Sequence, residues 1–104
     1  MRMWMVDPQT MCRKHLLGEH VECHMFNSTI NKGISIGGYL DKGLLEIHNL
    51  QKRHDELVKE MQRRGYQHKS PLVFYTAAKE GKIDADANCV ELCRRCGNAG
   101  GERG

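Results

Sequence analysis

Residues 11–26, MCRKHLLGEHVECHMF, place ionisable groups on one helical stripe. The stripe consists of His15, Glu19, Glu22 and Phe26, at i, i+4, i+7 and i+11. Gly18 lies on it one turn before Glu22; glycine there costs a helix about 1 kcal/mol against alanine but leaves room for another piece of backbone. The nearest candidate is the N-terminus, so we predict that the free amine of Met1 meets Glu22 over Gly18. The alternative is a half-exposed helix with ordinary surface carboxylates.

Three cysteines near the end of the chain have the spacing C-x3-C-x2-C: Cys89, Cys93 and Cys96. Structural zinc usually needs four ligands, with paired cysteines on a turn rather than within a helix. A fourth ligand could come from His68 or Cys12, but no spacing indicates either. We therefore interpret the three as small core side chains in a reducing compartment, with a small zinc-stabilised interaction module as the alternative.

His20 and His24 have the i, i+4 spacing that can hold a metal on a helix. No third ligand is evident, and the HExxH pattern is absent. We therefore predict no metal here, and two partly exposed histidines near phosphates.

Composition bounds the class of protein. A chain of 104 residues predicts one domain with a small core, and 39% hydrophobic with 28% charged residues is typical of a soluble globular protein. No apolar run approaches the ~20 residues of a membrane span, and the N-terminus lacks a signal-peptide apolar region. We expect a cytoplasmic protein without membrane contact, as the odd number of five cysteines also indicates. The net charge of +3 is a mild bias towards polyanions.

The first half of the chain is predicted to position the stripe on a long helix. Residues 1–6 are expected to be extended. Asp7 can cap a helix with Pro8 at its first position, and that helix should run to about Asn31 and end at Gly33.

Residues 33–48 hold four glycines and predict a loop with a turn at Gly37-Gly38. A second helix should follow, capped by Asn49 and closed by Gly65. Its apolar face would consist of Leu50, His54, Leu57 and Met61. Its charges Lys52, Arg53, Arg63 and Arg64 are expected on a solvated face.

Two further helices are predicted. Ser70-Pro71 should start a short helix that Gly81 ends, and Asp84 or Asp86 should cap a last helix through Cys96. The tail 97–104 is expected to be flexible. The fold class predicted for residues 1–104 is all-α, a small single domain of three to four helices with long loops.

Two blocks of the sequence resemble a known family. HLLGEHVE (residues 15–22), the Gly37-Gly38 loop and RHDELVKEMQRRGY (residues 53–66) are similar to the phage pyrimidine-dimer DNA glycosylase/AP lyases of the endonuclease V type. The second block matches R-x-x-E-L-x-x-E-x-x-x-R-G-aromatic at Arg53, Glu56, Leu57, Glu60, Arg64, Gly65 and Tyr66. The resemblance covers roughly the first two-thirds of the chain and implies a small, mostly helical fold.

The resemblance implies a nucleophile, the α-amine of the first residue, and a glutamate partner. Glu22 matches that glutamate, and the nucleophile falls on Met1, which we expect to be retained because Arg2 is too bulky for methionine removal. An α-amine has a pKa of about 7.7–8.0, against about 10.4 for lysine, so part of it is unprotonated near neutral pH. It would attack C1′, expel the base and form a Schiff base, while Glu22 stabilises the sugar and moves protons during β-elimination.

The resemblance also implies double-stranded DNA as the partner, with a monomer acting without a cofactor. Arg2 matches the arginine next to the nucleophile, and His15 the helix histidine. The family's arginines that flank the glutamate are replaced here by Val21 and Met25. Their DNA contacts must then be lost or supplied by a second group, Arg13, Lys14, His20 and His24. A DNA-binding relative without activity is therefore the first alternative.

Overall fold

Every regular element in the described part of the chain is a helix. The computed structural model describes residues 1–68, 71–76 and 78–96. Its elements are η1 (Pro8–Thr10), α1 (Arg13–Asn31), α2 (Gly37–Asp41), η2 (Ile47–Asn49), α3 (Leu50–Arg63) and α4 (Ala85–Cys96), where η marks a 3-10 turn. The predicted all-α class is confirmed.

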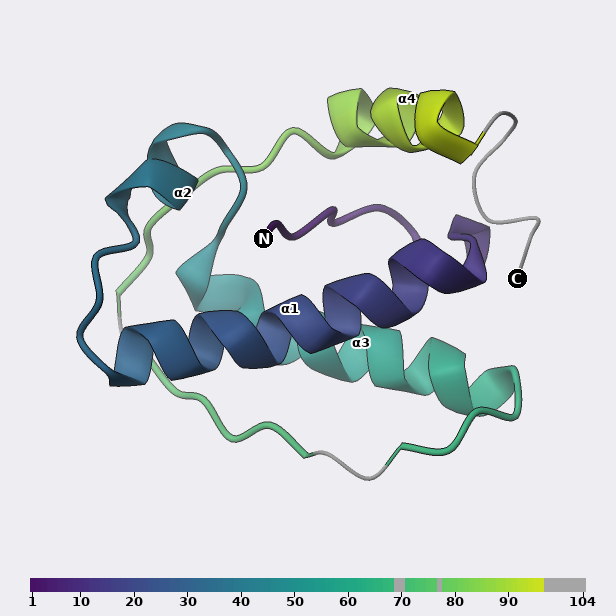
Figure 1. Cartoon of the computed structure of the whole chain (residues 1–104), viewed down its shortest axis with the longest axis horizontal. Coiled ribbons are helices and arrows are strands. Elements are labelled where there is room, and N and C mark those ends of the chain that lie inside the picture. The colour runs from purple at the N-terminus through teal and green to yellow at the C-terminus, as the bar shows by residue number, and fades with distance from the viewer. Residues whose placement is uncertain (69–70, 77, 97–104) are drawn as a thin grey trace.

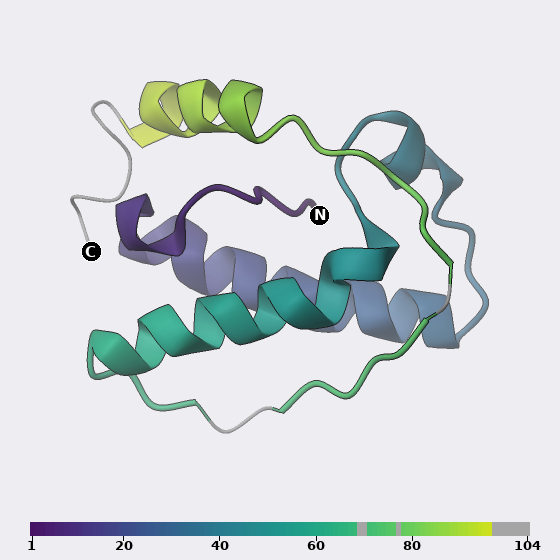
Figure 2. The same cartoon turned by 180° about the vertical axis from the view of Figure 1, so that it is seen from behind.

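Helices α1 and α3 pack side by side, and the extended residues 1–6 run between α1 and α4 (Figures 1 and 2). The amide of Met3 donates to the carbonyl of Leu44 at 2.8 Å, which ties this segment to the loop before α3. Met3, Trp4 and Val6 are buried. The N-terminal segment is therefore part of the core.

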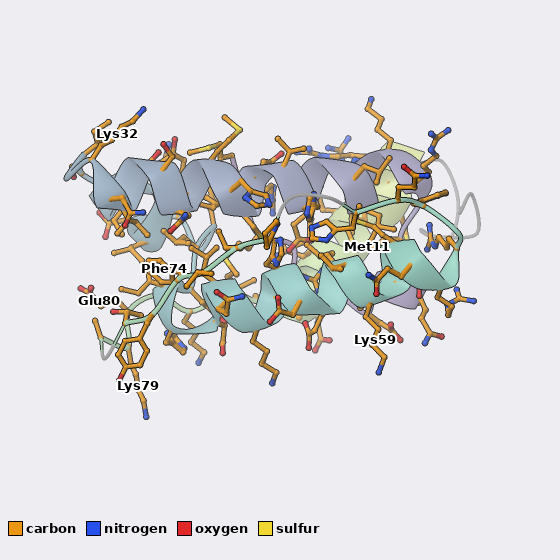
Figure 3. The ribbon with its side chains drawn as sticks, turned by 90° about the horizontal axis from the view of Figure 1, so that it is seen from below. Met11, Lys32, Lys59, Phe74, Lys79 and Glu80 are labelled. Carbon is orange, nitrogen blue, oxygen red and sulfur yellow. The ribbon has the colours of Figure 1, made fainter. Side chains whose placement is uncertain are left out.

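Apolar side chains of α1 and α3 contribute to one buried core. Leu16, Cys23 and Phe26 of α1 face the core, and the predicted face of α3 is buried, comprising Leu50, His54, Leu57 and Met61. Figure 3 shows Met11 directed between the two helices, while Lys59 points away from α3.

The first helix begins later than predicted. Asp7 does cap, accepting from the amide of Gln9 at 3.0 Å, but it caps only the short turn η1. The backbone is extended at Met11 and Cys12, and α1 starts at Arg13. The break allows the Met11 side chain to enter the core. The far end is as predicted, since α1 ends at Asn31 and Gly33 has φ +72°.

The glycine-rich loop also differs from the prediction. Gly37 and Gly38 open the short helix α2 instead of forming a turn. Helix α3 keeps its predicted limits, since it starts directly after Asn49 and Gly65 beyond its end has φ +85°. The predicted cap is wrong, however: the Asn49 side chain makes no capping hydrogen bond and its Nδ2 donates to Glu46 Oε1 at 2.8 Å.

The helix predicted after Ser70-Pro71 is wrong. Ser70 lies outside the described residues, and residues 71–76 and 78–84 are not helical. Their backbone groups instead bond to other segments. The amide of Phe74 donates to Gln51 Oε1 at 2.7 Å, and the amide of Ile83 donates to Glu46 Oε2 at 2.6 Å. Such contacts between distant segments outweigh local helix propensity.

The last helix forms as predicted, and of the two candidate caps it is Asp84 that caps it. Asp84 Oδ1 accepts from the amide of Ala87 at 3.0 Å, and α4 runs from Ala85 to Cys96. The predicted flexible tail, 97–104, lies outside the described residues.

Candidate active site

A buried ion pair joins the two long helices beneath the N-terminal segment. Arg53 of α3 donates to Glu19 of α1 through Nε at 2.6 Å and through a terminal nitrogen at 2.8 Å. It also donates to the carbonyl of Val6 at 2.8 Å. Burial alone would lower the pKa of Arg53, but its hydrogen bonds and charge pairing with Glu19 hold that pKa above the ordinary value. The expectation of a solvated Arg53 is wrong, since it is 2% exposed.

A second ionic contact fastens the turn before α1. Arg64 Nε lies 2.6 Å from Glu60, and a terminal nitrogen of Arg64 donates to the carbonyl of Met11 at 2.8 Å. Hydrogen bonds from Arg63 and Arg64 hold the pKa of Glu60 below its ordinary value, against the effect of its burial. The Arg64 side chain is only 8% exposed, so it too is not solvated, while Lys52 and Arg63 are exposed as expected.

Glu22 holds the start of the chain. Its Oε1 accepts a hydrogen bond from the backbone amide of Arg2 at 2.6 Å, so Met1 lies next to the carboxylate. Met1 and Glu22 are both half-buried. The contact differs from the predicted one in two respects. The described residues show no ion pair between the Met1 amine and Glu22, and none of them, apart from the chain neighbours of Gly18 and the adjacent backbone of α1, has an atom within 4 Å of a Cβ built on Gly18.

The Arg2 guanidinium is turned towards α4. It lies 3.8 Å from the centre of the Trp4 ring and donates to Asn88 Oδ1 at 2.7 Å. Asn88 Nδ2 in turn donates to the carbonyl of Trp4 at 2.8 Å. Burial, with repulsion from Arg95, lowers the pKa of Arg2. Helix α4 therefore positions the N-terminal segment from the side opposite α1.

The other residues predicted to bind DNA on the first turn of α1 differ in exposure. Arg13 and Lys14 are exposed, whereas His15 is half-buried with its ring edge-on to Trp4 at 5.7 Å. Burial, with the charges of Lys14 and Arg95, lowers the pKa of His15, which favours its neutral imidazole. Arg13 and Lys14 are accessible to a phosphate backbone.

A comparison with protein families shows the family to which the chain belongs. A family model described as pyrimidine dimer DNA glycosylase matches residues 1–73. The chain belongs to this family. The match includes Met1, Glu22 and both ionic contacts, and it confirms the resemblance noted above. Comparison with curated proteins and with solved structures found no match.

The family to which the chain belongs is one of DNA-repair glycosylases, whose substrate is DNA. Helix α4 lies beyond the matched residues. No described helix has the length and apolar character that a membrane crossing requires.

The surface around Glu22 lacks the positive charge that the resemblance leads us to expect. Val21 and Met25, which stand where the resemblance places arginines, are 53% and 47% exposed. Two apolar side chains, one helical turn apart, therefore occupy the exposed surface of α1 next to the glutamate.

The structure brings His20 and His24 together with two histidines that the sequence did not connect to them. His54 of α3 and His68 complete a group in which one ligand nitrogen from each residue lies within 4.8 Å of the others. His20 is buried, which corrects its expected partial exposure, and burial lowers its pKa to about 4. The prediction that no third ligand accompanies His20 and His24 is also wrong, because His54 and His68 lie beside them.

The cysteines of α4 do not fit the predicted role of core side chains. Cys89 is exposed and Cys93 half-buried, while the side chain of Cys96 lies outside the described part of the structure. Among the described side chains, no group able to hold a metal includes a cysteine.

Proposed function

We propose that the chain excises pyrimidine dimers and also cuts the DNA strand as an AP lyase, with the Met1 amine as nucleophile and Glu22 as its acid–base partner. One observation carries this proposal: Glu22 accepts the Arg2 amide at 2.6 Å, which holds residue 1 beside the carboxylate. A hydrogen bond to the neighbouring amide positions the amine while leaving its lone pair available to a substrate.

The chemistry follows from these two groups. The unprotonated amine attacks C1′ of the damaged nucleotide, and the bond from C1′ to the base breaks as the base leaves with its electron pair. Loss of a proton and ring opening give an imine between Met1 and C1′. Glu22 then removes a proton from C2′, and the bond from C3′ to its phosphate oxygen breaks, which cuts the strand. The duplex must be bent or a base displaced for the amine to reach C1′.

The surroundings of Glu22 support access of a DNA strand. The space above Gly18, one turn before Glu22, is open: apart from its chain neighbours and the adjacent backbone of α1, no atom of the described residues lies within 4 Å of the position of a Cβ. Arg13 and Lys14 are exposed on the first turn of the same helix. Backbone phosphates could be bound by these cations while a sugar approaches over Gly18.

Borohydride trapping tests the nucleophile. Intact mass first verifies that residue 1 of the purified protein carries a free amine. Borohydride added with duplex DNA containing an abasic site should then give a covalent adduct that peptide mapping assigns to the Met1 peptide. A protein with one additional residue ahead of Met1 should lose both adduct and strand cutting. An adduct on Lys14 would refute Met1 as the nucleophile.

The variant Glu22→Gln tests the partner. It should abolish cutting of duplexes that carry a dimer or an abasic site, while DNA binding persists. Glu80→Gln is the matched control, because Glu80 is exposed and its side chain has no role in the proposed site. Cutting by Glu22→Gln at the wild-type rate would contradict the assignment.

Val21 and Met25 favour a second candidate, a family member that binds damaged DNA without cutting it. Their exposed apolar side chains supply no charge to the phosphates beside Glu22. The same assays separate the two candidates: this one predicts wild-type protein that binds the duplexes but produces neither adduct nor strand break.

A further inference from the structure

Four histidines converge between α1, α3 and the segment that follows α3. They are His20, His24, His54 and His68. One ring nitrogen from each lies within 4.8 Å of the others, and neighbouring ring centres are 4.9–5.3 Å apart. His20 and His54 are buried, and His24 and His68 are half-buried. Four of the six histidines in the chain therefore share one site.

Several nitrogens at this site are buried and have no hydrogen-bond partner among the described residues. They are Nε2 of His20, His54 and His68. Leaving a buried polar atom unsatisfied costs about 1–3 kcal/mol. Three such atoms at one place would together destabilise the fold substantially, unless a ligand satisfies them.

The hydrogen bond of His54 shows which of its nitrogens is available. His54 Nδ1 lies 3.0 Å from Asp55 Oδ1, and because a carboxylate only accepts, Nδ1 carries the hydrogen. In the neutral imidazole, Nε2 then keeps its lone pair for the centre of the cluster. A carboxylate behind a histidine in this way is the usual support for a metal ligand. Gln51 Nε2 in turn donates to Asp55 at 3.1 Å.

We propose that these four imidazoles bind one Zn²⁺ ion. Imidazole nitrogens bind zinc at about 2.0–2.1 Å in a tetrahedron, which sets them roughly 3.3–3.4 Å apart. The observed limit of 4.8 Å therefore requires the rings to close by at most about 1.5 Å. Four protein ligands fill the coordination sphere, so the ion is structural and has no open position for a substrate.

The position of the site on α1 separates it from the proposed chemistry. At about 100° per residue, Glu22 is turned roughly 200° from His20, so the two groups lie on opposite faces of the helix. His68 belongs to a segment without helix or strand. The ion would fasten this segment to both long helices. This role does not depend on the proposed catalytic function.

Metal analysis of the tag-free full chain tests the proposal. Protein incubated with zinc and then dialysed should contain one zinc per chain, and zinc should raise its melting temperature. X-ray absorption should show only nitrogen neighbours at about 2.0–2.1 Å, without the sulfur neighbours at about 2.3 Å that cysteines would give. A substoichiometric zinc content, or a sulfur neighbour, would overturn the assignment.

Variants locate the ion. His68→Gln removes a ligand outside the helices and should weaken zinc binding by more than the roughly 10–100-fold expected for loss of the supporting carboxylate in Asp55→Ala. His48→Gln is the matched control, because His48 is exposed and outside the cluster, and it should bind zinc like wild type. Circular dichroism verifies that each variant is folded. A folded His68→Gln variant that binds zinc with wild-type affinity would refute the site. If His68→Gln does not fold, wild-type zinc affinity of Asp55→Ala would refute it instead.

Discussion

Replacing Arg53 by methionine tests whether the buried ion pair holds the N-terminal segment in place. The side chain of Glu19 is fully enclosed, and both of its oxygens accept hydrogen bonds from Arg53. Removing one partner of a buried pair costs about 3–5 kcal/mol because the other charge stays buried. The carbonyl of Val6 also loses its donor, which adds about 1 kcal/mol. We expect a loss of roughly 4–6 kcal/mol out of the about 5–15 kcal/mol that such a domain has.

Urea unfolding followed by circular dichroism measures this loss, and the melting temperature should fall by more than about 15 °C. The double variant Glu19→Leu/Arg53→Met should recover most of the stability, because it buries neither charge. Lys52→Met, the exposed neighbour, should change stability by less than about 0.5 kcal/mol. A loss below about 1 kcal/mol in Arg53→Met would refute the reasoning.

Three further predictions concern glycine, pH and salt. Gly81→Ala should destabilise the protein by more than about 1 kcal/mol in urea unfolding, because φ is +94° and a Cβ would lie 1.9 Å from the carbonyl of Leu45. Gly18→Ala should stabilise α1 by up to about 1 kcal/mol in the same measurement, yet it should slow strand cutting. The stability difference between wild type and Glu60→Gln should be constant above about pH 5 and shrink as pH falls below about 4.3, since the pKa of Glu60 is depressed in the folded state; unfolding curves at several pH values measure it. Arg13→Ala and Lys14→Ala should each reduce the slope of log affinity against log salt by about 0.9 in DNA titrations, and an unchanged slope would exclude that residue from phosphate contact.

Periodic apolar residues and helix-ending glycines predicted the long elements well. Helix α3 has both the predicted ends and the predicted buried face. The prediction of a helix after residue 70 failed because the contacts of this segment are non-local. Gln51 bonds to the backbone of Leu72 and Phe74, 21 and 23 residues away, and no local pattern contains that information.

The site was only partly predictable, for a related reason. Spacing and resemblance singled out Glu22 and the N-terminus, but they could not show that the contact runs through the Arg2 amide. Charge patterns placed Arg53 on a solvated face because helical charges usually lie there. Its neighbours Leu50 and Leu57, three residues before and four after, lie on the buried face and could have indicated a buried arginine.

His54 also lies on the predicted apolar face of α3, but this position pointed even less clearly to a site. One histidine on an apolar face is usually a satisfied core residue, and its relation to His20 appears only when α1 and α3 are packed together. Helix α1 then carries polar groups with unrelated roles on more than one face. Glu22 and Glu19 share one stripe, where Glu22 contacts the start of the chain and Glu19 pairs with α3, and His20 faces the histidine cluster from another face. Because polar groups on both faces must be satisfied, α1 cannot present one simple apolar face, and this explains why its sequence shows weaker amphipathic periodicity than that of α3.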